Sequence, residues 1–217
     1  FRGSAGGIAD VANLERSNTL FEYTMNYQKN INENNNITVL GGVTYQHFLN
    51  RFMGGNISGF PSDDTGTNNL NLGDSDNDQV LSNKVENKLL SYLGRINYSL
   101  MDKYLFTASF RADGSSRFGP NNRFGFFPSF AVAWRLSEEV FIPDFFHDLK
   151  LRASWGQIGN ESIGNLEYLT TLEPGNKFAV VNNNEVLGIE PPRVANPDLK
   201  WETTEQFDIG LDFALLE

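Results

Sequence analysis

Residues 88–136 read KLLSYLGRINYSLMDKYLFTASFRADGSSRFGPNNRFGFFPSFAVAWRL, and this stretch decides the fold. In residues 104–113, the large aromatic side chains of Tyr104, Phe106 and Phe110 alternate with polar ones such as Thr107 and Arg111. A period of two residues is typical of a β-strand whose two faces meet different environments. A soluble sandwich turns the apolar face inward, whereas a membrane barrel turns it outward to lipid. The alternation alone therefore leaves both architectures open.

The same strand pattern recurs along the whole chain. It is found in seven segments: residues 19–27, 36–48, 88–100, 104–113, 126–136, 148–157 and 203–213. No amphipathic helix of convincing length is predicted, and residues 137–146 allow only one turn before Pro143 ends it. We therefore predict an all-β fold of antiparallel strands.

The connections between these segments alternate in length. The short connections are residues 28–35, 101–103 and 137–147, and the longer ones are residues 49–87, 113–125 and 158–201. Because antiparallel neighbours place every second connection at the same end, we expect short turns at one end and long loops at the other. Outer-membrane barrels have this asymmetry, and soluble sandwiches rarely do.

Composition excludes several classes of protein. The chain has 217 residues, a formal net charge of −10 and no Cys, so disulfide frameworks and thiol nucleophiles are excluded. The acidic balance argues against nucleic acid as a partner. No apolar run reaches the length of about 18 residues that a membrane-spanning helix needs.

The first residues lack a signal peptide and the last stop in an apolar run, so we expect an internal piece of a longer protein.

Several ordered motifs resemble one known family over nearly the whole chain. They are LSYLGRINY at residues 90–98, DKYLFTAS at 102–109, DGSSRFGPNNR at 113–123, AWRLSEE at 133–139, LKLRASWG at 149–156, and NPDLKWE at 196–202. This series resembles the SusC/RagA family of TonB-linked outer-membrane transporters. The matching residues are mostly barrel residues, so the resemblance does not identify a cargo.

The resemblance implies a transmembrane outer-membrane β-barrel in a Gram-negative bacterium. Members of the family have barrels of about 22 strands filled by a plug. This chain would supply about seven strands, with residues 1–217 forming one barrel segment and the plug and TonB box lying elsewhere. The implied partners are a SusD-like surface lipoprotein, TonB acting through the absent plug, membrane lipid and lipopolysaccharide, and an oligosaccharide or peptide cargo. No cofactor and no enzymatic activity are expected.

In such a barrel, one face of each strand meets lipid and the other meets the lumen. The residues expected to face lipid are Ile96, Phe106, Phe110, Val132, Leu151 and Ile209. The candidate lumen-facing residues are Arg95, Thr107, Arg111, Asp113, Arg135, Arg152 and Asp208. In the loop of residues 113–125, Arg117 and Arg123 either contact cargo or pair with neighbouring strand ends, and we favour the structural role.

Other candidate sites are less specific. Asp74, Asp76 and Asp78 have the alternating oxygen ligands of a calcium loop. Gln79 and Val85 replace the Gly and Glu that such a loop needs, so a solvated acidic loop is favoured. The histidines, His47 and His147, are interpreted as structural.

A soluble all-β carbohydrate-binding or adhesion module is the alternative. Trp155, Trp201 and Tyr168 could then stack on sugar rings. The aromatic residues near strand ends, such as Tyr98, Tyr104 and Trp134, would in that case be ordinary core residues rather than the interfacial belts of a membrane protein. Dependence on detergent distinguishes the two hypotheses, because a soluble module needs none.

Overall fold

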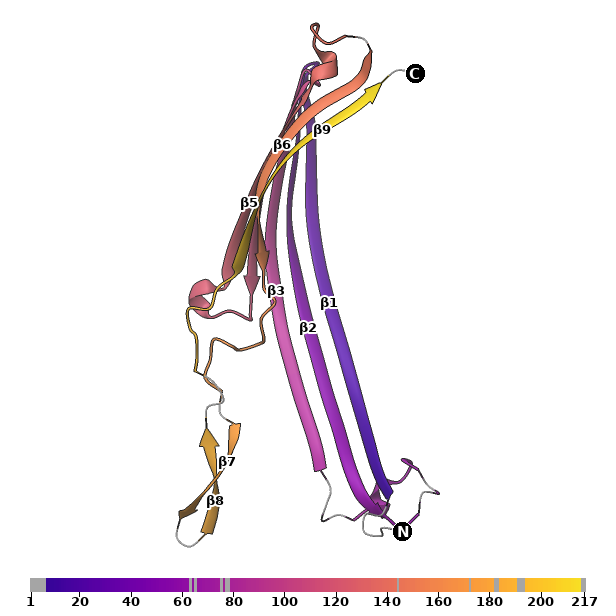
Figure 1. The fold of residues 1–217 in the computed structure, drawn as a ribbon, viewed down its shortest axis with the longest axis vertical. Coiled ribbons are helices and arrows are strands. Elements are labelled where there is room, and N and C mark those ends of the chain that lie inside the picture. Colours follow the sequence, from indigo (N-terminus) through magenta and orange to yellow (C-terminus); the bar gives the residue numbers. More distant parts are fainter. Residues whose placement is uncertain are drawn as a thin grey trace. The chain divides into compact units, whose positions relative to one another are not determined.

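In the computed structural model, nine strands form a seven-stranded sheet and a separate hairpin (Figure 1). The structure describes residues 7–62, 64, 66–74, 76, 79–143, 145–171, 173–181, 184–190 and 194–215, with backbone alone for 173–190. The strands are β1 (Gly7–Asn32), β2 (Asn35–Phe60), β3 (Gln79–Leu100), β4 (Tyr104–Ser115), β5 (Phe124–Arg135), β6 (Phe146–Asn160), β7 (Glu173–Val181), β8 (Asn184–Glu190) and β9 (Glu202–Leu215). The large sheet has the order β1-β2-β3-β4-β5-β6-β9, and β7 pairs with β8. The predicted all-β fold is confirmed.

The chain divides into two compact units. Unit 1 consists of Phe1–Thr19 and His47–Asn87, and unit 2 consists of Leu20–Gln46 and Lys88–Glu217. The core of unit 1 is small: Ala9, Ile57 and Phe60 are buried together, with Leu70 packed against them. Among the described residues, no helix is long and apolar enough to cross a bilayer.

Within unit 2, the strands β3, β4, β5, β6 and β9 pair in this order, each antiparallel to the next. Tyr98 lies opposite Phe106, which lies opposite Val132, and the row continues through Ala153 to Ile209. The neighbouring row runs from Asn97 through Thr107, Ala131 and Ser154 to Asp208. Because directly opposed residues share a face, the alternation along each strand becomes two faces of the sheet. We call them the apolar face, which contains Phe106, and the polar face, which contains Thr107.

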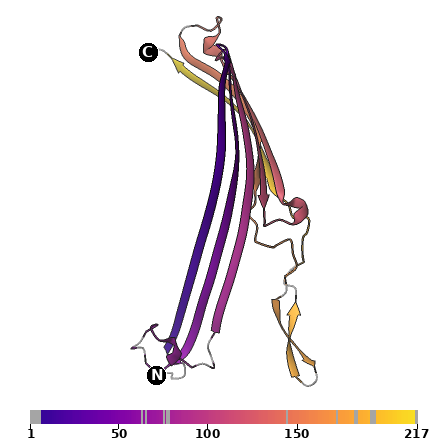
Figure 2. The same cartoon turned by 180° about the vertical axis from the view of Figure 1, so that it is seen from behind.

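Short turns occupy one end of the strands of unit 2, seen at the top of Figure 1. The β3–β4 link has left-handed backbone at Met101 (φ 52°) and Asp102 (φ 53°), as tight hairpin turns require. Within this link, Met101 N donates to Asn34 O of the neighbouring β1–β2 turn. The β5–β6 link contains the 3-10 turn η4 (Leu136–Glu138), which agrees with the single turn predicted there. Figure 2 shows from behind that the longer connections after β4 and β6 leave from the opposite ends of these strands.

All three predicted long loops were too long and one hairpin was missed. The β4–β5 connection is residues 116–123 instead of 113–125. Residues 49–60 continue β2 and residues 79–87 begin β3, so the β2–β3 connection is residues 61–78. Residues 158–160 belong to β6, and β7 and β8 lie inside the predicted loop of residues 158–201. The first strand extends from Gly7 to Asn32, well beyond residues 19–27. Regular alternation of apolar and polar residues ends before these strands do, but the backbone pairing continues.

Candidate functional site

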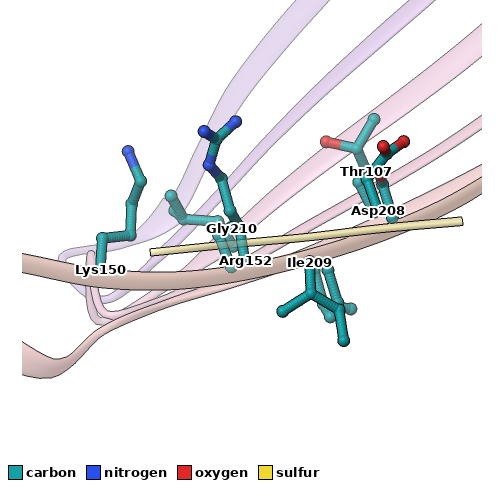
Figure 3. A pocket seen from close by; sticks show the side chains of 12 residues that line it. Thr107, Lys150, Arg152, Asp208, Ile209 and Gly210 are labelled. Atoms are coloured by element: carbon teal, nitrogen blue, oxygen red, sulfur yellow. The ribbon is translucent and has the colours of Figure 1, made fainter. Parts of the chain in front are cut away.

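The polar face of unit 2 carries an open depression of about 570 Å³. Its floor is made of small side chains, Ala131, Ala133 and Ser154, together with Gly210. Lys150, Arg152, Thr107 and Asp208 point from the same side of the sheet, whereas Ile209 points from the other (Figure 3). Because these residues are small, no bulky apolar side chain covers the depression. The charged side chains around it therefore remain accessible.

The charges on this face are organised around carboxylates. Asp212 binds Lys150 Nζ and Arg152 Nη2, each at 3.1 Å. Farther along the strands, Arg111 Nε donates to both carboxylate oxygens of Asp113 at 2.7 Å. Arg111 also donates from Nη2 to Ser91 Oγ at 3.2 Å. These pairs hold cationic side chains in fixed positions on a surface that remains open.

All six charged lumen candidates fall on the polar face by register. Arg95, Arg111, Asp113, Arg135, Arg152 and Asp208 occupy the rows that alternate with Phe106. They do not form one cluster: Arg111 pairs with Asp113, and Arg135 donates to Asp102 O at 3.4 Å. Asp208 accepts from Gln206 at 3.1 Å. Lys150 and Asp212 join Arg152 and were missing from the predicted set, although their place in the alternation could have identified them.

The apolar face displays large side chains rather than burying them. Phe106 is 44% exposed, Phe130 55% and Ile209 70%. Aromatic rings contact one another across strands, with centroids 6.0–6.2 Å apart in the pairs Tyr98–Phe106, Phe110–Phe126 and Phe130–Trp155. The six predicted lipid-facing residues all lie on this face by register. A continuous exposed apolar surface of this kind needs an apolar surrounding.

The loop end of unit 2 contains an aromatic cluster that the sequence did not predict. Phe118, in the β4–β5 loop, is fully buried, and its ring lies 5.1 Å from that of Trp201. Phe127 contacts the same indole edge-on at 5.4 Å. Trp201 Nε1 donates to Arg123 O at 3.1 Å. We call Phe118, Phe127 and Trp201 the loop-end cluster.

Arg117 ties the β4–β5 loop to the segment after β6. Its Nη1 donates to Glu161 O at 3.2 Å and to Ile163 O at 2.9 Å. The structural role favoured for Arg117 is therefore what the contacts show. Gly159 belongs to the same arrangement, because a Cβ there would lie 2.0 Å from the Phe127 ring. Arg123, by contrast, is exposed and contributes its backbone carbonyl.

The remaining candidates do not assemble into a site. Asp76 N donates to Asp74 Oδ1 at 3.1 Å, an ordinary turn contact, and Asp78 lies outside the described residues. Within the described part of the chain, no group of three His, Cys, Asp or Glu residues could hold a metal ion. His47 Nε2 lies 3.2 Å from Glu86 Oε1 in unit 1. Trp155 stacks on Phe130, and Trp201 is engaged in the loop-end cluster, so these two do not form a sugar platform together.

Comparison with known proteins identifies the family of this chain. Residues 3–216 match the family model described as TonB dependent receptor-like, beta-barrel. The chain belongs to the TonB-dependent receptor family. It is 37% identical over 97% of its length to TonB-dependent receptor P26 of Formosa agariphila, and 44% identical over 60% of its length to TonB-dependent receptor SusC of Bacteroides thetaiotaomicron.

Solved structures give the same result for the fold of this receptor chain. The structure of the RagAB peptide transporter matches 95% of the chain with a TM-score of 0.85 and 28% identity. The RagAB peptide importer in its open-open state matches with a TM-score of 0.83. The chain covers 22% of those chains, 21% of receptor P26 and 13% of SusC. It therefore corresponds to a part of the length of its relatives, within their β-barrel.

Proposed function

We propose that this chain is part of the wall of an outer-membrane, TonB-dependent transporter of the SusC/RagA type. The observation that carries the proposal is the division of one sheet into an exposed apolar face and a charged polar face. In a membrane barrel the apolar face meets lipid and the polar face meets the water-filled interior. The six charged candidates and the Lys150–Asp212–Arg152 group then face the lumen.

The loop end belongs, in this proposal, on the extracellular side. The turn at Met101 and Asp102 offers little surface, whereas residues 61–78 and 161–201 are long enough to meet a partner or cargo. A SusD-like lipoprotein would dock on that side, near lipopolysaccharide. TonB would act from the periplasm through a plug supplied by the rest of the protein.

The proposed cargo class is supported by the name of one relative and by the polar face. RagAB is a peptide transporter, and SusC is a TonB-dependent receptor. Hydrogen-bonding groups and paired charges on a wet surface suit hydrophilic oligosaccharide or peptide fragments. We propose import of one of these two classes. An enzymatic reaction is not proposed.

Uptake by intact cells tests the transport function. The full-length receptor is expressed in cells that lack it, with and without TonB, and fluorescent oligosaccharide and peptide pools are offered separately. TonB-dependent accumulation of one pool is expected. Equal accumulation with and without the receptor would overturn the proposal, and the pool that enters identifies the cargo class.

Protease access tests the orientation. A cleavable tag is inserted near Asn69, in the β2–β3 connection, and near Asn183, which lies outside the described residues. A third tag in the β3–β4 turn at Asp102 is the control for the opposite end. Cleavage of the first two on intact cells, with the third protected, is expected. Cleavage only after the outer membrane is opened would invert the topology.

A further inference from the structure

The β5–β6 link is apolar and displayed to the outside. Val140 is 100% exposed, Phe141 is 67% exposed and Phe145 is 54% exposed. These residues lie in a short connection, where polar residues that favour turns are the usual choice. Large apolar side chains gathered at one exposed link indicate a surface that contacts something apolar.

The carboxylate of Glu139 connects the link to side chains of β4 and β5. Glu139 Oε1 accepts hydrogen bonds from Tyr104 Oη at 2.9 Å and from Trp134 Nε1 at 3.1 Å. Its other oxygen lies 3.4 Å from Lys103 Nζ. Backbone bonds from Glu139 N to Leu136 O and from Ile142 N to Glu139 O complete the turn. These backbone bonds enclose Val140 and Phe141 within the turn.

The exposed link continues the apolar face of the sheet. Phe141 packs edge-on against Trp134, with ring centroids 6.4 Å apart, and Trp134 stacks on Tyr104 at 6.0 Å. Trp134 lies in the same register row as Leu151 and Leu211, both on the apolar face. One apolar surface thus extends from the strands to the link. The rings of Tyr104 and Trp134, which carry polar atoms, lie between the two.

We infer that the β5–β6 link is a membrane-surface anchor whose Val140, Phe141 and Phe145 insert into the interfacial region of the lipid leaflet at the short-turn end. The inference rests on the proposed function, because it needs the apolar face of the strands to meet lipid. Rings of Tyr and Trp with a polar atom are favoured at the boundary between headgroups and acyl chains. Tyr104 and Trp134 occupy that position here, between the apolar face and the link.

The β3–β4 turn provides a matched control at the same end of the sheet. It is tight and carries one exposed large apolar side chain, Met101, beside the exposed Asp102, whose carboxylate accepts from Ser99 Oγ at 3.0 Å. The anchor should therefore be a property of the β5–β6 link and not of every short turn. A probe at Asp102 reports the water side of the boundary.

Nitroxide probes in the full-length receptor test the inference. The receptor, freed of any other cysteine, is reconstituted in phosphatidylcholine vesicles with single probes at Val140→Cys, Phe145→Cys, Asp102→Cys, Phe106→Cys or Thr107→Cys. Collision rates with oxygen, which enters lipid, and with a nickel chelate, which stays in water, are compared. Probes at 140 and 145 are expected to collide with oxygen several-fold more, relative to the chelate, than the probe at 102.

The probes at 106 and 107 show whether a negative result contradicts the anchor alone or also the proposed function. A lipid signal at 106 with a water signal at both 140 and 145 overturns the anchor and leaves the proposed function standing. A water signal at 106 as well as at 107 overturns the proposed function itself. The probe at 145 keeps the test decisive if labelling at 140 prevents folding.

Discussion

Phe106 and Phe118 are the same amino acid in two opposite situations. Phe106 lies on the apolar face of β4 and is 44% exposed, whereas Phe118 lies in the loop that follows and is fully buried. Phe118 finds its apolar surroundings in this chain, against Trp201. Phe106 stacks on Tyr98 and lies opposite Val132, yet almost half of it stays exposed.

The difference shows that two sources of stability operate in one chain. The loop-end cluster is stabilised as a soluble protein is, by packing its own side chains. The strands bury few large side chains among themselves, so the free energy of their apolar face depends on the solvent around it. Substitutions at the two places should therefore respond differently to lipid.

The largest effect is expected for Phe118→Ala. Removing a fully buried Phe ring costs about 3–5 kcal/mol. We expect the β4–β5 loop to open, with faster hydrogen exchange in residues 115–123 and 161–163, in detergent and in vesicles alike. Hydrogen exchange with mass spectrometry of the full-length receptor measures this.

Phe124→Ala is the matched control for the loop-end cluster. Phe124 begins β5 close to the same loop but is 43% exposed. Truncating it should change exchange in residues 161–163 much less than Phe118→Ala does. Equal exchange in the two variants would show that the cluster does not hold the loop.

The next largest effect is expected for Phe106→Arg. An arginine on the lipid face near the midplane of a barrel costs about 2–4 kcal/mol. Thr107→Arg, one residue away on the polar face, should fold almost normally because its side chain reaches water. Urea titration of folding into lipid vesicles compares the two full-length variants. Equal losses would contradict the assignment of the faces.

Much of this fold could be predicted because the two faces of the sheet differ in side-chain polarity. In β4, β5 and β9 the predicted strand bounds differ from the observed ones by no more than two residues, for example residues 104–113 against Tyr104–Ser115. The same rule explains the failures. Residues 49–60 lack regular alternation but continue β2, since pairing of the backbone with neighbouring strands needs no difference between faces.

The loop-end cluster could not be predicted from local pattern. Trp201 and the carbonyl that it binds, on Arg123, are far apart in sequence, and no periodicity connects them. Arg117 likewise finds Glu161 and Ile163 only through the return of β6. On the polar face, the alternation identified Arg152 as a candidate, but register was needed to place Asp212 and Lys150 beside it.

A smaller effect is expected for Arg117→Lys. Lysine keeps the charge but loses the planar fork that reaches two carbonyls, and each hydrogen bond lost here costs about 0.5–1.5 kcal/mol. Residues 161–163 should exchange faster while the aromatic packing at Phe118 persists. Arg123→Lys serves as the control because the exposed Arg123 contributes its backbone carbonyl instead. If both variants exchange alike, the contacts of Arg117 do not stabilise the loop.

The smallest effect is expected at the opposite end, from the titration of Glu139. The hydrogen bonds from Trp134 and Tyr104, with Lys103 nearby, hold the pKa of the Glu139 carboxyl below its ordinary value. A carboxyl with a lowered pKa in the folded state adds stability above its unfolded pKa, and this is lost as pH falls through the folded pKa. A nitroxide at Val140 should therefore gain mobility as the pH is lowered from about 6 to about 3. In Glu139→Gln the amide oxygen still accepts both hydrogen bonds but does not titrate, so the mobility should not change with pH. The same pH dependence in both proteins would assign the change to another group and remove Glu139 as the residue that orders the link.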